Sequence, residues 1–411
     1  MAKLKPERRK KKREKSVLNG VRQPNSPKKQ RTQESPHALL AQATALLSSA
    51  PHDALPLAQR ALDLLSPSSV PTARSLPASD LVGQIFLELG NPDAAREHFL
   101  AAAQLDPDGL VLETDGGGAA KFLWLAQLSE EGGKDSERWY KRGVTALRRH
   151  IAGLSDALGT NEKALVESKS KELANAFCGM AELYMTDLSW EEDAESRCEA
   201  LAMEALLVAP SAPEPLQTIA SIRISQTRFE DAKAALERSM SLWSVANPSS
   251  QPPPPFPTRV SLTRLLMEVD MNDEAMTVLE GLVEDDDESV EVWYLGGWNL
   301  YLMGMKTSEG DESSQPGSRR NLLKGSQDWL GSCLKLYSLQ QYEDDRLRDH
   351  AVELTNGLKE AVGEDAGEED EENGSGSDWV DNEDDDDDNE TFSEDPTMDQ
   401  QDGIHEQMSR S

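Results

Sequence analysis

The chain has 411 residues, of which 37% are hydrophobic and 5% aromatic, and 42 Lys and Arg stand against 75 Asp and Glu for a net charge of −33. A chain this polar cannot bury enough apolar surface along its whole length to offset its conformational entropy, so we expect folded material flanked by disorder. No apolar run approaches the roughly 18 residues of a membrane span, and no secretory signal opens the chain, so we expect a soluble protein that is not secreted.

Residues 1–35 are expected to form a disordered basic head. Residues 1–31 hold 13 Lys and Arg and two acids, a net charge of +11, with little that could be buried. Two basic clusters about ten residues apart are typical of a bipartite nuclear localisation signal. A nonspecific RNA-binding arm and a plain solubility tail remain alternatives. The residues assigned to the signal are Arg8, Arg9, Lys10, Lys11, Lys12, Arg13, Lys28, Lys29 and Arg31.

Residues 36–362 are expected to form a helical repeat array. Apolar residues recur there at spacings of three and four, Ala, Leu and Glu are abundant, and no alternating strand pattern occurs. Residues 76–109 combine small residues, where two helices can cross closely, with large apolar residues and a proline that stops the second helix. This pattern resembles the tetratricopeptide repeat (TPR), a helix-turn-helix of 34 residues. The residues that carry the resemblance are Gly83, Phe86, Gly90, Ala95, Phe99, Ala102 and Pro107.

The same spacings recur further along the chain. Residues 213–246 and 256–289 repeat them closely, and another unit begins near Trp293. Counting the less regular units, the pattern predicts an all-α, TPR-like right-handed superhelical solenoid of about seven helix pairs. The less regular units are residues 37–67, 119–151 and 174–210.

Other segments depart from the repeat. A helix predicted at residues 152–176 is longer than the repeat needs, and helices predicted at 319–341 and 343–361 would close the array. Three insertions interrupt the repeats, and their proline and glycine residues predict surface loops rather than strands. These insertions are residues 108–118, 247–255 and 307–318.

The concave surface of such a superhelix is lined by the first helix of each pair. On each first helix, the residues just before and after the small packing position are expected to point to this surface. By this rule, acids lie in the N-terminal half of the surface and aromatic residues at its C-terminal end. Carboxylates attract Lys and Arg, and aromatic rings stack on guanidinium groups. The alternative is that the aromatic residues are core of the closing units and the acids an ordinary solvated face. The predicted partner-binding residues are Asp80, Glu88, Glu130, Glu131, Glu182, Glu268, Glu291, Tyr294, Trp298 and Tyr301, and the other predicted groove residues are Gln84, Gln127, Met185, Gln217, Ser221, Ile224, Arg264 and Met267.

Residues 363–411 are expected to form a disordered acidic tail. They hold 21 acids and one Arg, a net charge of −20, which leaves −24 for residues 32–362. Both values favour a basic partner, which the tail would shield from RNA, although a plain solubility tail remains an alternative.

The usual signatures of catalysis are missing. No GxxxxGK[ST], GxSxG or HExxH motif occurs, and Cys178, Cys198 and Cys333 form no CxxC pair and have no neighbouring His. We therefore expect no enzyme, no cofactor, no metal site and no disulfide framework.

Together, the array, the basic head and the acidic stretch at residues 378–388 (DWVDNEDDDDD) resemble the fungal assembly chaperones dedicated to large-subunit ribosomal protein four. The resemblance implies that the groove binds a long extended loop of the newly made ribosomal protein, protects it from aggregation and accompanies it into the nucleus for pre-60S assembly. An escort of this kind is expected to be a monomer that forms a one-to-one complex and shuttles between cytoplasm and nucleus. The basic clusters of the head predict an import receptor as a second partner, and neither a membrane nor a direct nucleic-acid role is expected. A nuclear TPR scaffold subunit and a histone-type acidic chaperone are the alternatives.

Overall fold

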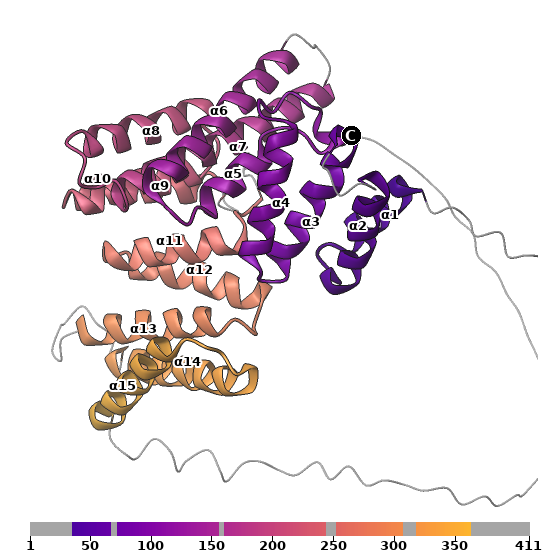
Figure 1. Ribbon diagram of the computed structural model, residues 1–411. Helices are drawn as coiled ribbons and strands as arrows, with labels where there is room; N and C mark the ends of the chain where they lie inside the picture. The colour runs from indigo at the N-terminus through magenta and orange to yellow at the C-terminus, as the bar shows by residue number, and fades with distance from the viewer. Residues whose placement is uncertain (1–34, 67–71, 156–159, 244–251, 307–317, 363–411) are drawn as a thin grey trace, which may run out of the picture. The chain divides into compact units, whose positions relative to one another are not determined.

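The computed structural model describes a chain of helices. Within the described residues there are fifteen α-helices and two short 3-10 helices, and no strand (Figure 1). The all-α prediction is confirmed. None of the described helices is both long enough and apolar enough to cross a membrane. The head with its predicted localisation signal and the acidic tail lie outside the described residues, which are 35–66, 72–155, 160–243, 252–306 and 318–362.

Successive helices form seven pairs, as the repeat pattern predicted. By its internal contacts the chain divides into the unit Met1–Leu358, which holds all seven pairs, and the unit Lys359–Ser411. The pairs are α1 (Pro36–Leu46) with α2 (Pro51–Leu65), α3 (Leu76–Glu88) with α4 (Pro92–Leu105), α5 (Ala120–Gln127) with α6 (Gly133–Ser155), α7 (Thr160–Met185) with α8 (Ala194–Val208), α9 (Glu214–Ser225) with α10 (Phe229–Ser241), α11 (Phe256–Glu268) with α12 (Asn272–Asp285), and α13 (Val290–Lys306) with α14 (Ser318–Gln340); α15 (Asp345–Val362) follows.

Neighbouring pairs stack in the manner of a TPR-like superhelix. The first helix of a pair contacts the second helix of the pair before it, as α3 contacts α2 and α9 contacts α8. First helices also contact one another, from α7 to α9, from α9 to α11 and from α11 to α13. This arrangement puts the first helices from α7 to α13 side by side, so that they form a continuous surface.

The small residues of the repeat explain the close pairing. A Cβ atom on Gly83 of α3 would lie 2.8 Å from the ring of Phe99 in α4, which is fully buried. Ala95 faces the same contact and is also fully buried. Gly90 adopts a φ of +69° in the turn, a conformation that glycine takes without strain, and Asn91 then caps α4.

A pair of glycines has the same role in the last unit. A Cβ atom on Gly296 would lie 2.0 Å from the Trp329 ring, and one on Gly297 would lie 2.6 Å from Leu330. The hydroxyl of Ser326 donates a hydrogen bond of 2.7 Å to the carbonyl oxygen of Gly297. Because these glycines allow close approach, α13 and α14 form the most extensive helix contact in the described part of the chain.

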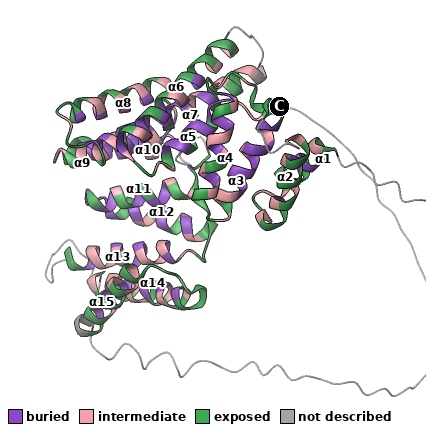
Figure 2. Cartoon of the chain, in the orientation of Figure 1, coloured by how far each residue is buried: buried purple, intermediate pink, exposed green. Residues whose placement is uncertain are grey.

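The apolar core lies where the paired helices contact each other. In the sixth pair Leu262, Leu266, Ala275, Leu279 and Leu282 are fully buried. Figure 2 shows buried and exposed residues sharing the same helices, as amphipathic helices require. The repeat units predicted from spacing alone therefore have the predicted small and large residues inside.

One helix prediction agrees with the structure in part and two others agree closely. Of the helix predicted at 152–176, residues 160–176 belong to the long helix α7, whereas residues 152–155 are the end of α6. The helices predicted at 319–341 and 343–361 correspond to α14 and α15.

The predicted insertions are described in part. Residues 108–118 form an irregular loop with one short 3-10 helix, η2 (Glu113–Asp115), while the other, η1 (Ala73–Ser75), precedes α3. The insertions predicted at 247–255 and 307–318 lie mostly outside the described residues.

Candidate functional site

A cavity of about 470 Å³ opens on the surface made by the first helices. Side chains of α5, α7, α9 and α11 line it, and Tyr140 of α6 closes one side. Five of the predicted groove residues line this cavity. They are Gln127, Glu182, Gln217, Ser221 and Arg264.

The cavity also contains residues that the sequence analysis missed. Asn175 lies seven residues before Glu182 on α7, and Glu214 lies seven residues before Ser221 on α9. Residues seven positions apart lie two turns apart on the same face of a helix. Counting seven residues back from each predicted groove residue would therefore have found both. No such signal pointed to Tyr140, because it belongs to a second helix.

Two carboxylates of the cavity stand out by their surroundings. Glu182 and Glu214 both lie close enough to Cys178 to affect its thiol, whose pKa is raised to about 12, chiefly by burial. The Glu182 side chain is exposed to the groove, yet displacement of water by the surrounding protein raises the pKa of its carboxyl. In the described part of the chain, no Lys, Arg or His forms an ion pair with either carboxylate.

Carboxylates elsewhere in the fold have such partners. Glu137 of α6 is buried, and burial alone would raise its pKa, but hydrogen bonds from Lys141 and Tyr184 hold the pKa below its usual value. The distance between Lys141 Nζ and Glu137 Oε1 is 2.8 Å. Glu182 and Glu214 therefore differ from the paired carboxylates in lacking a compensating cation.

The first predicted acid of the groove, Asp80 on α3, is half-buried. Burial raises the pKa of its carboxyl to about 6, and the positive charge of Lys121 and a hydrogen bond from Gln84 only partly oppose this. The distance from Gln84 Nε2 to Asp80 Oδ2 is 2.7 Å. Glu88, two turns further along α3, is exposed. Neither acid lines the cavity of about 470 Å³.

Three more predicted acids lie outside this cavity. Glu130 follows α5 and pairs with Arg96 of α4 at 3.2 Å, so its charge is already partly compensated. Glu131 is exposed beside it, and Glu268 is exposed at the end of α11. Of the ten predicted partner-binding residues, only Glu182 lines the cavity.

The C-terminal end of the predicted site packs within the chain. Glu291 of α13 forms an ion pair with Arg264 of α11. The Tyr294 hydroxyl and His350 Nδ1 are 2.8 Å apart, and the Trp298 ring meets the edge of the His350 ring at a centroid distance of 5.4 Å. His350 belongs to α15, so Tyr294 and Trp298 are half-buried against it. This is the arrangement in which the aromatic residues belong to the closing units; Tyr301 is half-buried too.

The described residues offer little for catalysis. They contain no group of three or more His, Cys, Asp and Glu that could hold a metal ion. All three cysteines are buried and free, and burial raises the pKa of Cys198 and of Cys333 to about 11. Such thiols stay protonated near neutral pH and are poor nucleophiles.

Comparison with known proteins places the chain in a family. A protein of Emericella nidulans described as a probable assembly chaperone of rpl4 is 46% identical over 393 residues, which cover 92% of this chain and 96% of that protein. The chain belongs to the family of assembly chaperones of rpl4. A protein of Schizosaccharomyces pombe with the same description is 34% identical over 285 residues, 68% of this chain and 80% of that protein. No model of a protein family matches the chain.

A solved structure supports the fold as well. The structure of the assembly chaperone of RpL4 (Acl4), residues 1–338, is 48% identical to this chain and superposes with a TM-score of 0.57. It covers 66% of this chain, and this chain covers 98% of it. The family resemblance inferred from the sequence is confirmed.

Proposed function

We propose that this chain is a dedicated chaperone of ribosomal protein L4 and that its groove binds a basic, extended segment of that protein. The names of the relatives support the partner. Three features of the chain support the chemistry: the cavity on the first helices, the acids around it, and a net charge of −24 over residues 32–362.

The lack of a compensating cation at Glu182 and Glu214 carries the proposal. A carboxylate in partly desolvated surroundings is stabilised by an opposite charge within about 4–6 Å. A Lys or Arg of the partner that entered the cavity would supply this charge and lower the pKa of Glu182.

The remaining lining suits an extended polypeptide. Gln127, Asn175 and Ser261 bring amide and hydroxyl groups to the cavity, and these can donate to or accept from the free backbone groups of a ligand. Arg264 is the one cation that lines this cavity, and it is paired with Glu291. A site for an acidic ligand would need more positive charge than this.

The test is a charge reversal in the groove with a matched control. Purified full-length chain is titrated with ribosomal protein L4, and the Kd is measured for Glu182→Lys combined with Glu214→Lys. Because both attractive charges become repulsive at close range, we expect the affinity to fall at least about tenfold. The control combines Glu237→Lys on α10 with Glu280→Lys on α12, two exposed acids on second helices. It has the same net charge and should bind like the parent.

Two outcomes would contradict the groove as the site. If both double variants lose affinity equally, only the net charge of the chain matters. If neither loses affinity, the partner binds elsewhere on the protein. Circular dichroism spectra that match the parent show that each variant is folded.

We also propose that the protein meets its partner as a monomer and escorts it from cytoplasm to nucleus through the basic head. Residues 1–31, fused to a reporter too large to diffuse through the nuclear pore, should accumulate in the nucleus, and a reporter that stays cytoplasmic contradicts the import role. Light scattering should give the mass of a one-to-one complex, whereas a larger assembly would favour a scaffold.

A further inference from the structure

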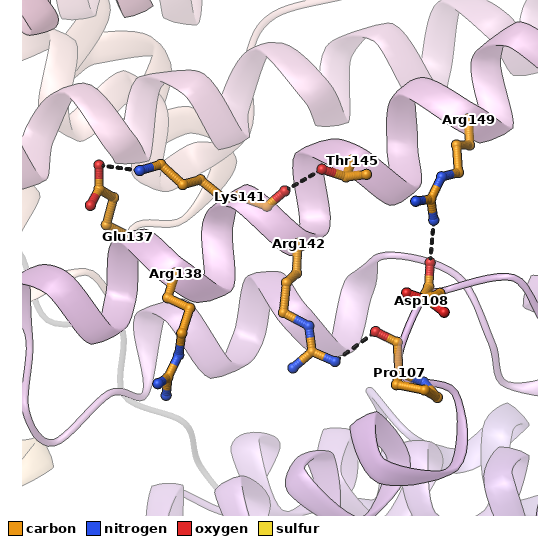
Figure 3. Close-up of a pocket in the computed structure, with 8 residues that line it drawn as sticks. All are labelled: Pro107, Asp108, Glu137, Arg138, Lys141, Arg142, Thr145 and Arg149. Carbon is orange, nitrogen blue, oxygen red and sulfur yellow. Dashed lines mark hydrogen bonds and ion pairs between the residues drawn. The ribbon is translucent and has the colours of Figure 1, made fainter.

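Helix α6 carries cations on the face that is turned away from the groove. Tyr140 of this helix lines the groove cavity, while Arg138 and Arg142 lie two residues before and after it. A step of two residues turns an α-helix by about 200°, so these arginines point to the other side. There they line a separate cavity of about 460 Å³, together with Lys141 and Arg149 (Figure 3).

Two of these arginines keep an uncompensated charge. Arg142 donates to the carbonyl oxygen of Pro107 at 2.6 Å, and Arg149 donates to that of Asp108 at 3.1 Å. In the described part of the chain no carboxylate forms an ion pair with either guanidinium, and a carbonyl oxygen orients such a group without neutralising it. Figure 3 shows Arg138 and Arg142 pointing to the same side of α6.

The acids of this cavity do not cancel its charge. Four cations line it against two carboxylates, those of Glu137 and Asp108. Glu137 is held by Lys141 and by the Tyr184 hydroxyl, and Arg138 is paired with Asp135. The cavity is thus a positive site on a chain whose net charge is −33.

The site is held in place by buried contacts. The Arg142 guanidinium lies 4.6 Å from the ring centroid of Phe122 and 4.7 Å from that of Trp139. The loop that supplies the carbonyl groups is anchored where Lys121 Nζ meets Asp106 Oδ2 at 2.7 Å, and both side chains are buried. A preorganised site of this kind loses little entropy when a ligand binds.

Exposed leucines adjoin the cations. Leu110 and Leu112, in the loop between α4 and α5, are 68% and 67% exposed. With Arg149 they line a neighbouring cavity of about 170 Å³, so Arg149 borders both cavities. Glu113 and His150 line this second cavity too, and the Glu113 carboxylate is paired with Lys169 at 2.7 Å. A ligand that spans the two cavities would meet positive charge first and the leucines next.

We propose that this face of α6 binds an acidic segment of a partner protein, one with an apolar residue beside its carboxylates. Arginine pairs with carboxylates through two parallel hydrogen bonds, and the leucines would cover the apolar residue. RNA fits less well because single strands are held by stacking on aromatic rings, and Trp139, which borders the arginines, is only 8% exposed.

The probe is a labelled synthetic peptide with the sequence of residues 376–392, which holds acids together with Trp379, Val380 and Phe392. Binding is measured on the full chain and on a full-length variant that carries Asp384→Asn, Asp385→Asn, Asp386→Asn, Asp387→Asn and Asp388→Asn. This variant has fewer acids of its own that could compete with the probe. The combination Arg138→Glu with Arg149→Glu should weaken binding about tenfold at low salt.

Variants of the two exposed leucines and matched control variants complete the experiment. Leu110→Ser with Leu112→Ser should weaken peptide binding several-fold even at 0.5 M salt, where charges are screened. Arg320→Glu and Leu339→Ser, both at exposed positions of α14, should leave it unchanged. The proposal is overturned if the α6 and leucine variants bind the peptide like the parent. It is also overturned if an RNA oligonucleotide binds more tightly than the peptide and the arginine variants lose only the RNA.

Discussion

The half-buried carboxylate of Asp80 allows a direct test of what a negative charge in the predicted groove costs in stability. Burial raises its pKa from 3.8 to about 6, so the folded state holds the proton more tightly than the unfolded state. The charged form is therefore costly in the folded protein above about pH 6. The cost is relieved as the pH falls through 6 and is gone below about 3.8, where both states are protonated.

Asp80→Asn removes the charge and keeps the shape of the side chain. Raising the pKa from 3.8 to about 6 corresponds to about 3 kcal/mol, so at pH 8 the variant should be more stable than the parent by up to about that amount. At pH 5 the parent is mostly protonated when folded, and the gain should fall to about half. The Asn amide can still form a hydrogen bond with Gln84.

Urea unfolding followed by circular dichroism at pH 8 and pH 5 measures both free energies. The control is Glu88→Gln, which neutralises an exposed acid on the same helix and should change the stability by no more than about 0.5 kcal/mol. An Asn variant that is no more stable than the parent at pH 8 would refute the reasoning, because the charge would then carry no cost.

The same carboxylate makes a prediction about binding. If a cation of the partner lies against Asp80, binding lowers its pKa and releases a proton, so the affinity of the parent should rise with pH through about 6. Asp80→Asn should lose this part of the pH dependence. A pH profile identical in parent and variant would show that the partner does not contact Asp80.

Two further predictions concern the fold. Gly83→Ala should cost about 1–3 kcal/mol of stability because its Cβ atom would meet a buried ring, whereas Gly281→Ala, with no atom within 4 Å, should be neutral or stabilise the protein by up to about 1 kcal/mol; equal effects in urea unfolding would contradict the packing argument. Lys121→Met should cost about 3–5 kcal/mol because it leaves the buried carboxylate of Asp106 without its cation. Lys306→Met removes an exposed ion pair and should cost under about 1 kcal/mol, and a similar loss in both variants would refute the distinction.

The sequence by itself determined the repeat. Helix pairing in a solenoid joins segments that are close in the chain, so the spacing of Gly83, Ala95 and Phe99 already specifies which faces meet. The same locality allowed the ends of α14 and α15 to be predicted to within about two residues. It placed the start of α7 less well, at residue 152 instead of Thr160, because apolar residues at helical spacing continue along the sequence from one helix to the next.

The tertiary structure decided which predicted acids remain available for a partner. Glu130 is paired with Arg96, and Glu291 with Arg264, and both ion pairs join different helix pairs. Likewise His350 of α15 reaches the aromatic residues of α13, more than fifty residues away in the chain. Repeat spacing shows that a side chain faces the groove, but it cannot show whether a residue from another repeat already meets it. That depends on contacts between units, which only the folded chain brings together.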